Sequence, residues 1–172
     1  NYSSISNCLV EYNIANNGGG VAYNSIYDSM IRYNYASNYG GGYYQLAQPY
    51  VVITNSTFLC NTSKNGFGGV YINAGSWDIK GCKIIRNEST NSSVGGLCVS
   101  GNAGVYNTLI ASNKAKTSIG GIQMEGNSGA PKIINCILDG NIAPSNSCCY
   151  IYQTPAFYNC TILNHAGADA IK

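Results

Sequence analysis

Charged residues are scarce in this chain, and long apolar runs are absent. Asp, Glu, Lys and Arg make up 9% of its 172 residues, against about 25% in an average globular protein. The net charge is +2 and the basic residues are scattered, so we expect no nucleic-acid partner. No apolar stretch approaches the roughly 20 residues of a membrane helix, so we also expect no membrane span.

Histidine and paired cysteines are scarce too. His165 is the only histidine, and no C-x-x-C pair occurs among the eight cysteines. Structural zinc sites usually need such pairs or several histidines, so we expect no metal and no cofactor. The seven acids are spread along the chain, whereas a glycoside hydrolase places two carboxylates together. We therefore expect no enzymatic activity.

The chain does contain an internal repeat, which recurs seven times. Each copy reads apolar, any, Asn-like, then Cys, Ser or Thr, any, apolar, any, any, and a closing Asn. A Gly-Gly pair follows in five copies and opens another short alternating segment, while Cys148-Cys149 stands there in the sixth. The closing position is Asn13, Asn34, Asn61, Asn87, Asn113, Asn141 and His165, at spacings of 21, 27, 26, 26, 28 and 24 residues.

This repeat predicts an all-β fold. Each copy holds three short segments with period-two alternation, and no helix-length apolar stripe appears. Short strands at this period are typical of a right-handed parallel β-helix, a solenoid of about seven three-strand coils. We treat residues 1–172 as a single β-helix domain. The first apolar positions should form one buried column: Ile5, Ile26, Ile53, Ile79, Val105, Ile133 and Phe157.

The Asn-like position of each repeat predicts a ladder along one turn. Asn tolerates the left-handed backbone of a tight turn, and its amide can bond to the equivalent Asn one coil away. We assign a structural role to His165 as well, because it replaces the closing Asn of the last repeat. The residues that we assign to the ladder are Asn7, Asn55, Asn107, Asn135 and Asn159.

The repeated motifs resemble those of a known group of surface proteins. Phe58-Leu59-Cys60-Asn61 reads as F-x-x-N, and Gly120-Gly121-Ile122 resembles G-G-A-I, although other copies relax this to G-G-V, G-G-Y or G-G-L. The combination is similar to the β-helical passenger repeats of chlamydial polymorphic outer-membrane proteins and related adhesins. This resemblance, over essentially the whole chain, implies an extracellular or cell-surface structural protein without catalytic residues.

Cysteines and glycosylation sequons supply further candidate sites. Cys136 and Cys160 share an inward column in adjacent coils, about 4.8 Å apart, where a disulfide and two free thiols are both open because parallel stacking can misalign the Cβ atoms. Cys148 and Cys149 could bridge each other or pair outward. Sequons at Asn61, Asn87 and Asn91 fall at or in the variable loop, where an N-glycan would fit.

The outer face of the second strand predicts an interface. Eight of its fourteen outward positions are apolar, whereas a solvated sheet face is mostly polar. We expect a second copy, another part of a longer chain, or a host partner to cover it. The candidate interface residues are Leu59, Ile85, Leu109, Ile137 and Leu163.

The first function that we consider is a non-catalytic extracellular structural or adhesin-like β-helix. Ile5 is already in register and the repeat runs to His165, so we expect a slice of a longer β-helix or a filament subunit that stacks end to end. Its partner would be another copy, or a cell-surface or carbohydrate partner.

The second function is a β-helix of the pectin lyase type that binds or cleaves carbohydrate. The fold alone does not exclude it, and the outward tyrosines Tyr27, Tyr106 and Tyr158 could stack on sugars, although Tyr also simply suits strands. Ice binding is a weaker third alternative, because regular Thr-x-Thr arrays are missing.

Overall fold

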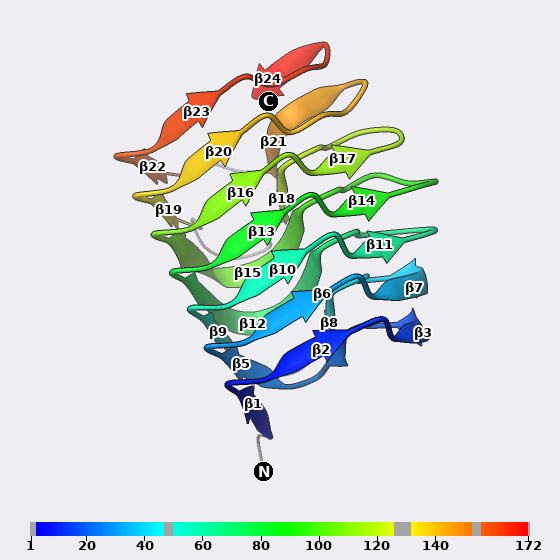
Figure 1. Cartoon of the computed structure of the whole chain (residues 1–172). Helices are drawn as coiled ribbons and strands as arrows, with labels where there is room; N and C mark the ends of the chain where they lie inside the picture. The colour runs from blue at the N-terminus through cyan, green and yellow to red at the C-terminus, as the bar shows by residue number, and fades with distance from the viewer. Residues whose placement is uncertain (1–2, 47–49, 126–131, 153–155, 172) are drawn as a thin grey trace.

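The computed structural model describes residues 3–46, 50–125, 132–152 and 156–171. These residues form a parallel β-helix with three sheets, in which strands pair with their counterparts one coil away. In Figure 1 the chain crosses the near face from left to right and returns behind it while climbing from the N- to the C-terminus, which is a right-handed winding. The predicted fold class is therefore confirmed.

The seven-stranded sheet takes one strand from each of the seven sequence repeats, whereas only five coils of the described residues carry a strand in all three sheets, fewer than the predicted seven. It forms the near face of Figure 1. Its strands are β2 (Leu9–Glu11), β6 (Met30–Arg32), β10 (Thr57–Leu59), β13 (Lys83–Ile85), β16 (Leu109–Ala111), β20 (Ile137–Asp139) and β23 (Thr161–Leu163).

The five-stranded sheet stops before the other two do. Beyond β17 this face continues only as isolated bridges, Lys114 to Ile142 and Ile142 to Ala166, so only five coils carry a strand here. Its strands are β3 (Ile14–Asn17), β7 (Tyr35–Tyr39), β11 (Thr62–Ser63), β14 (Glu88–Ser89) and β17 (Lys114–Ala115).

The twelve-stranded sheet receives two segments per coil, which merge into single long strands in β12 and β15. Its strands are β1 (Ser4–Ser6), β4 (Val21–Ala22), β5 (Ser25–Tyr27), β8 (Tyr43–Leu46), β9 (Tyr50–Thr54), β12 (Val70–Lys80), β15 (Leu97–Tyr106), β18 (Ile122–Glu125), β19 (Lys132–Ile134), β21 (Asn146–Tyr152), β22 (Ala156–Tyr158) and β24 (Asp169–Ile171).

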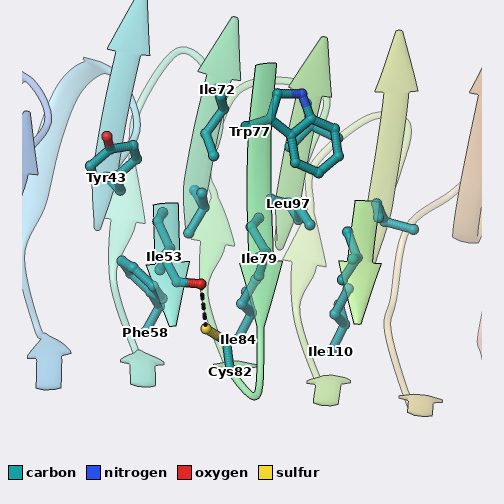
Figure 2. Close-up of a cluster of buried hydrophobic side chains, with 14 of the residues drawn as sticks. Tyr43, Ile53, Phe58, Ile72, Trp77, Ile79, Cys82, Ile84, Leu97 and Ile110 are labelled. Carbon is teal, nitrogen blue, oxygen red and sulfur yellow. Dashed lines mark hydrogen bonds between the residues drawn. The ribbon is translucent and has the colours of Figure 1, made fainter. Parts of the chain in front are cut away.

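The core fills the space between the three sheets. The predicted column from Ile5 to Phe157 is in register throughout; its inner members are at most 1% exposed, and its two end members are partly buried. Figure 2 shows Ile53 and Ile79 beside Phe58, Ile84 and Trp77. The Trp77 indole is buried, and its Nε1 donates to the Ser100 carbonyl at 3.0 Å.

The closing Asn column forms a buried hydrogen-bonded ladder at the turn that leads into the five-stranded sheet. The Asn87 Oδ1 accepts from the backbone nitrogen and the Nδ2 of Asn61, at 2.9 and 3.0 Å. Its Nδ2 donates to the Phe58 carbonyl and to the Asn113 Oδ1, both at 3.0 Å. Both lone pairs and both hydrogens of the amide are therefore used, as they also are in Asn34, Asn61 and Asn113.

His165 continues this ladder in the last coil. Its Nδ1 accepts from the Asn141 backbone nitrogen at 3.3 Å, and its Nε2 lies 3.1 Å from the Leu138 carbonyl. These contacts assign the hydrogen to Nε2, so the imidazole reproduces one accepting and one donating contact of an Asn amide. The predicted structural role of His165 agrees with this geometry.

The ladder imposes close packing and strained backbone on its surroundings. A Cβ at Gly42 would lie 2.8 Å from the Gly69 carbonyl and 3.0 Å from the Asn61 Nδ2, which leaves no room for a side chain. The residue before each closing Asn is left-handed, with φ of 53° at Tyr33 and Cys60 and 54° at Arg86. Such bulky residues rarely adopt this conformation, and here the hydrogen bonds of the following Asn hold it.

We predict that Asn87→Ala lowers the free energy of unfolding by about 3 kcal/mol or more. The substitution leaves the Asn61 backbone nitrogen unpaired in the core, at about 1–3 kcal/mol. It also removes the three other hydrogen bonds of the amide, each at about 0.5–1.5 kcal/mol. Asn91→Ala is the matched control, because Asn91 is exposed in the next loop and should change stability by less than about 0.5 kcal/mol. Urea denaturation measures both, and equal effects would contradict the ladder's role.

Candidate functional site

The predicted Asn ladder lies at the turn between the twelve- and seven-stranded sheets, and only its backbone conformation matches the prediction. The φ angles of Asn7, Asn55, Asn107, Asn135 and Asn159 are 52°, 49°, 49°, 54° and 53°. Their side chains are exposed, and hydrogen bonds link only parts of the row, such as the Asn159 Nδ2 to the Asn135 Oδ1 at 2.8 Å. The continuous ladder is the inward closing column instead, because its amides are shielded from water.

Two of the three predicted glycosylation sites are wrong. Asn61 and Asn87 are 0% exposed, and their Nδ2 atoms already donate two hydrogen bonds each. A glycan on either nitrogen would break the ladder and would have no exit from the core. Asn91 is exposed in a bend and stays a predicted acceptor.

Of the two alternatives left open for Cys136 and Cys160, the structure has the free thiols, as it does for all eight cysteines. The Cys136 sulfur lies 3.5 and 3.3 Å from the carbonyl oxygens of Val105 and Ile134, and the Cys160 sulfur lies 3.3 Å from those of Ile133 and Tyr158. The single hydrogen of each thiol is thus shared between two backbone acceptors. Each thiol therefore bonds to backbone rather than to the other sulfur.

These cysteines belong to a second column, which hydroxyls and thiols share: Cys8, Ser29, Ser56, Cys82, Thr108, Cys136 and Cys160. The Cys82 nitrogen donates to the Thr108 Oγ1 at 3.2 Å, and the Cys82 thiol donates to the Ile53 carbonyl at 3.5 Å, the contact drawn in Figure 2. The Ser29 nitrogen likewise donates to the Ser56 Oγ at 3.1 Å. The recurrence of Cys, Ser and Thr at this position is thus a hydrogen-bonding requirement.

Cys148 and Cys149 also lie in the core, and both are 0% exposed. Because Ile122 pairs with Cys149, the counterpart of the Gly-Gly pair is Ser147-Cys148, one residue earlier than the sequence suggested. A hydrogen bond with Cys149, together with burial, raises the pKa of the Cys148 thiol.

We predict that native-state alkylation at about pH 8 labels Cys8 and spares Cys82 and Cys136. Cys8 is exposed, whereas burial raises the pKa of Cys82 and of Cys136 to about 11. The two buried thiols therefore stay protonated and unreactive at that pH. Peptide mass spectrometry after iodoacetamide reads the labels, with urea-unfolded protein as the control that should take up eight. Labelling of Cys82 as fast as Cys8 would contradict this packing.

The predicted interface residues lie on the outer face of the seven-stranded sheet. Leu109 pairs with Ile137 in one outward column, and Leu59 pairs with Ile85 in the other, which ends in Leu163. Leu59, Ile85 and Leu109 are half-buried, while Ile137 and Leu163 are 45% and 44% exposed. This strip of five residues, the apolar strip, therefore stays open to a partner.

Two equivalent grooves lie beside the apolar strip, at the turn between the twelve- and seven-stranded sheets that carries the exposed Asn side chains. The first, of about 450 Å³, is lined by Asn7, Cys8, Leu9 and their counterparts in the next two coils. The second, of about 270 Å³, is lined by Gly81, Cys82 and Lys83 and by their counterparts. Because the same columns line both, the surface repeats with the coil.

The outer face of the twelve-stranded sheet carries a cluster of aromatic rings that the sequence did not reveal. Phe67 stacks on Tyr71, with ring centroids 4.1 Å apart and planes 9° from parallel. Tyr44 and Tyr39 contact Tyr71, and Tyr23 meets Tyr44 edge-on. Tyr23 and Tyr39 are 51% and 43% exposed. Tyr39 ends β7 and Phe67 lies in a loop, so their distance from Tyr71 could not be read from the spacing of the repeat. The fold of the coil brings both rings against Tyr71.

The outward column that follows the Gly-Gly pairs runs through Tyr44, Tyr71, Cys98, Gln123 and Tyr150. The next residue, Ile151, pairs with the buried Met124.

Three of the seven acids form ion pairs in the described part of the chain. Glu11 and Arg32, one coil apart, pair at 2.6 Å, and their hydrogen bond raises the pKa of the Arg32 guanidinium. Asp78 pairs with Lys80 at 3.0 Å, and Glu88 pairs with Lys114 at 3.1 Å. Within the described residues no group of three or more His, Cys, Asp or Glu side chains could hold a metal ion.

Comparisons with protein-family models, with curated proteins and with solved structures yield no match to this chain. The likeness to passenger repeats therefore rests on the repeated motifs and on the solenoid itself. Among the described residues, none lies in a helix long and apolar enough to cross a membrane. The class that the structure defines is the parallel β-solenoid.

Proposed function

We propose that the protein is a non-catalytic structural module of an extracellular or cell surface, an adhesin-like β-helix that presents a repeated surface. The observation that carries the proposal is the unbroken ladder from Asn13 to His165. It keeps consecutive coils in register at about 4.8 Å, so outward side chains form straight columns. A rigid rod with columns suits display and assembly. The resemblance to passenger repeats supports the location.

The apolar strip is the surface through which we propose that copies associate. Its exposed members, Ile137 and Leu163, extend from a sheet whose columns are otherwise interrupted by Lys83 and Asp139. Apolar side chains on a regular sheet face favour burial against a matching surface. Lateral packing of solenoids in a filament would provide it.

We predict that the concentrated native protein forms oligomers or filaments and that Ile137→Glu raises the concentration needed by about tenfold, or 1.4 kcal/mol, because a charge would have to be buried. Ile14→Glu is the matched control, since Ile14 is 80% exposed on another face and should leave assembly unchanged. Sedimentation velocity and negative-stain electron microscopy measure both. A monomer at every concentration would refute assembly through this strip.

Carbohydrate binding is the second candidate function, and the aromatic cluster favours it. Exposed tyrosine rings beside partly buried ones offer flat apolar faces with polar hydroxyls at their edges, a combination that suits sugar rings. Tyr23 and Tyr39 supply the exposed faces.

For this second candidate we expect Tyr39→Ala to weaken binding of soluble cello- and xylo-oligosaccharides about fivefold, through the loss of roughly 1 kcal/mol of stacking. Tyr50→Ala is the control, because Tyr50 is 49% exposed and is not one of the rings of the cluster. Affinity electrophoresis reads the retardation. The absence of any retardation by the wild-type protein removes this candidate.

A further inference from the structure

The positive charge of the chain is concentrated around the five-stranded sheet. Lys64, Arg86, Lys114 and Lys116 lie in or beside β11, β14 and β17, with Glu88 among them, and we call these five residues the basic patch. Four cations and one acid give the patch a charge of +3. Since the whole chain carries +2, the remaining residues sum to −1. A cluster of this kind attracts an anionic partner.

The coil geometry sets the basic patch in rows along the solenoid axis. Lys64, Thr90 and Lys116 occupy equivalent places, because the nitrogens of Thr90 and Lys116 donate to the carbonyls of Ser63 and Ser89, one coil back. The row therefore reads cation, hydroxyl, cation at steps of about 4.8 Å. Lys116 is exposed. Beside this row, Lys114 and Glu88 pair in register.

A groove of about 470 Å³ opens within the basic patch. Its polar rim holds Thr90, Lys114 and Lys116, and Ile142 and Pro144 give it an apolar side. Ile142 is 46% exposed. Cations, a hydroxyl and an apolar wall converge here on a space large enough for a sugar unit.

We propose that this groove binds an acidic polysaccharide that runs along the solenoid axis. The Lys116 and Lys114 ammonium groups would bind its carboxylates or sulfates, Thr90 would hydrogen-bond to its hydroxyls, and Ile142 and Pro144 would contact the apolar face of a ring. This site would supply a ligand for the proposed surface module. The proposal rests on the proposed function in one respect only, the extracellular location, where such polysaccharides occur.

Glu88 and the groove's lining decide between a polysaccharide and a nucleic acid. The Glu88 carboxylate can accept hydrogen bonds from sugar hydroxyls, but it repels a backbone with a phosphate at every unit. None of the groove's lining residues is aromatic, whereas single-stranded nucleic acids are held by stacking of their bases. The chemistry therefore favours a hydroxyl-rich chain of lower charge density.

The test measures retention of the native protein on immobilised heparin and polygalacturonate, with neutral dextran and duplex DNA as comparison matrices. We expect retention on the two acidic polysaccharides, a decline as salt is raised, and weaker retention on DNA. Lys116→Glu should weaken binding to the acidic polysaccharides about fivefold, because it replaces an attraction with a repulsion. Glu88→Gln should strengthen it, because it removes the only acid of the patch and keeps an acceptor.

Lys83→Glu is the matched control, because it makes the same charge change at an exposed position in β13, on the seven-stranded sheet. Thermal melting by circular dichroism confirms that the variants fold. Lack of retention on both acidic polysaccharides, equal losses in Lys116→Glu and Lys83→Glu, or stronger retention on DNA would each overturn the proposal. Filament formation by the same protein is measured separately and tests the proposed structural role. A negative result for polysaccharide binding therefore does not contradict the structural role, and a negative result for filaments does not contradict polysaccharide binding.

Discussion

The buried Asn amide is the interaction on which the rest of the fold depends. A solenoid turn brings backbone nitrogens and carbonyls into the interior, where an unpaired group costs about 1–3 kcal/mol. An Asn amide has two donor hydrogens and two acceptor lone pairs, so it can hydrogen-bond to such backbone groups and to the Asn residues of the coils before and after it. In Asn87 all four contacts are made, at 2.9 to 3.0 Å. The coil spacing of the whole rod is thus fixed at this turn.

Other buried polar groups show what the amide achieves. Ser63 and Ser89 sit in an inward column otherwise filled mostly by Ala, and their hydroxyls have no hydrogen-bond partner. Gln45 receives a bond from the Tyr43 hydroxyl at 3.0 Å, yet its own Nε2 is unpaired. The closing Asn column, by contrast, satisfies its side-chain polar atoms along the axis from Asn34 to Asn113. The hydrogen-bonding geometry of the amide, rather than polarity alone, stabilises polar groups in this core.

The sequence was sufficient for the fold because every coil repeats the same constraint. The apolar column from Ile5 to Phe157 followed from spacing alone. The choice of ladder did not, because Asn55 and Asn61 are alike in sequence and differ only in whether the chain turns them outward or inward. The same ambiguity produced the wrong glycosylation sites at Asn61 and Asn87.

The surface sites were harder to predict from spacing. Phe67 lies in a loop and Tyr71 in a strand, and only the fold stacks them. Lys114 and Glu88 are separated by 26 residues and become neighbours only through the coil register. Loops of differing length follow the closing Asn, so the repeat gives no fixed position for what they carry. The fold determines which residues form an outward column, but the residue types in that column can differ from coil to coil.

One consequence of the ladder concerns how such a protein can change its length. Each Asn amide bonds only to the coil directly before and the coil directly after it, so a coil has no partner further away. Duplication of one coil between two equivalent Asn residues would therefore restore every contact and extend the rod by about 4.8 Å. Duplication of the coil that runs from Asn87 to Ser112 would move Lys64 one coil further from Lys116 and leave Lys114 beside a copy of Glu88. Length and ligand spacing can thus evolve together, while the cross-section stays constant.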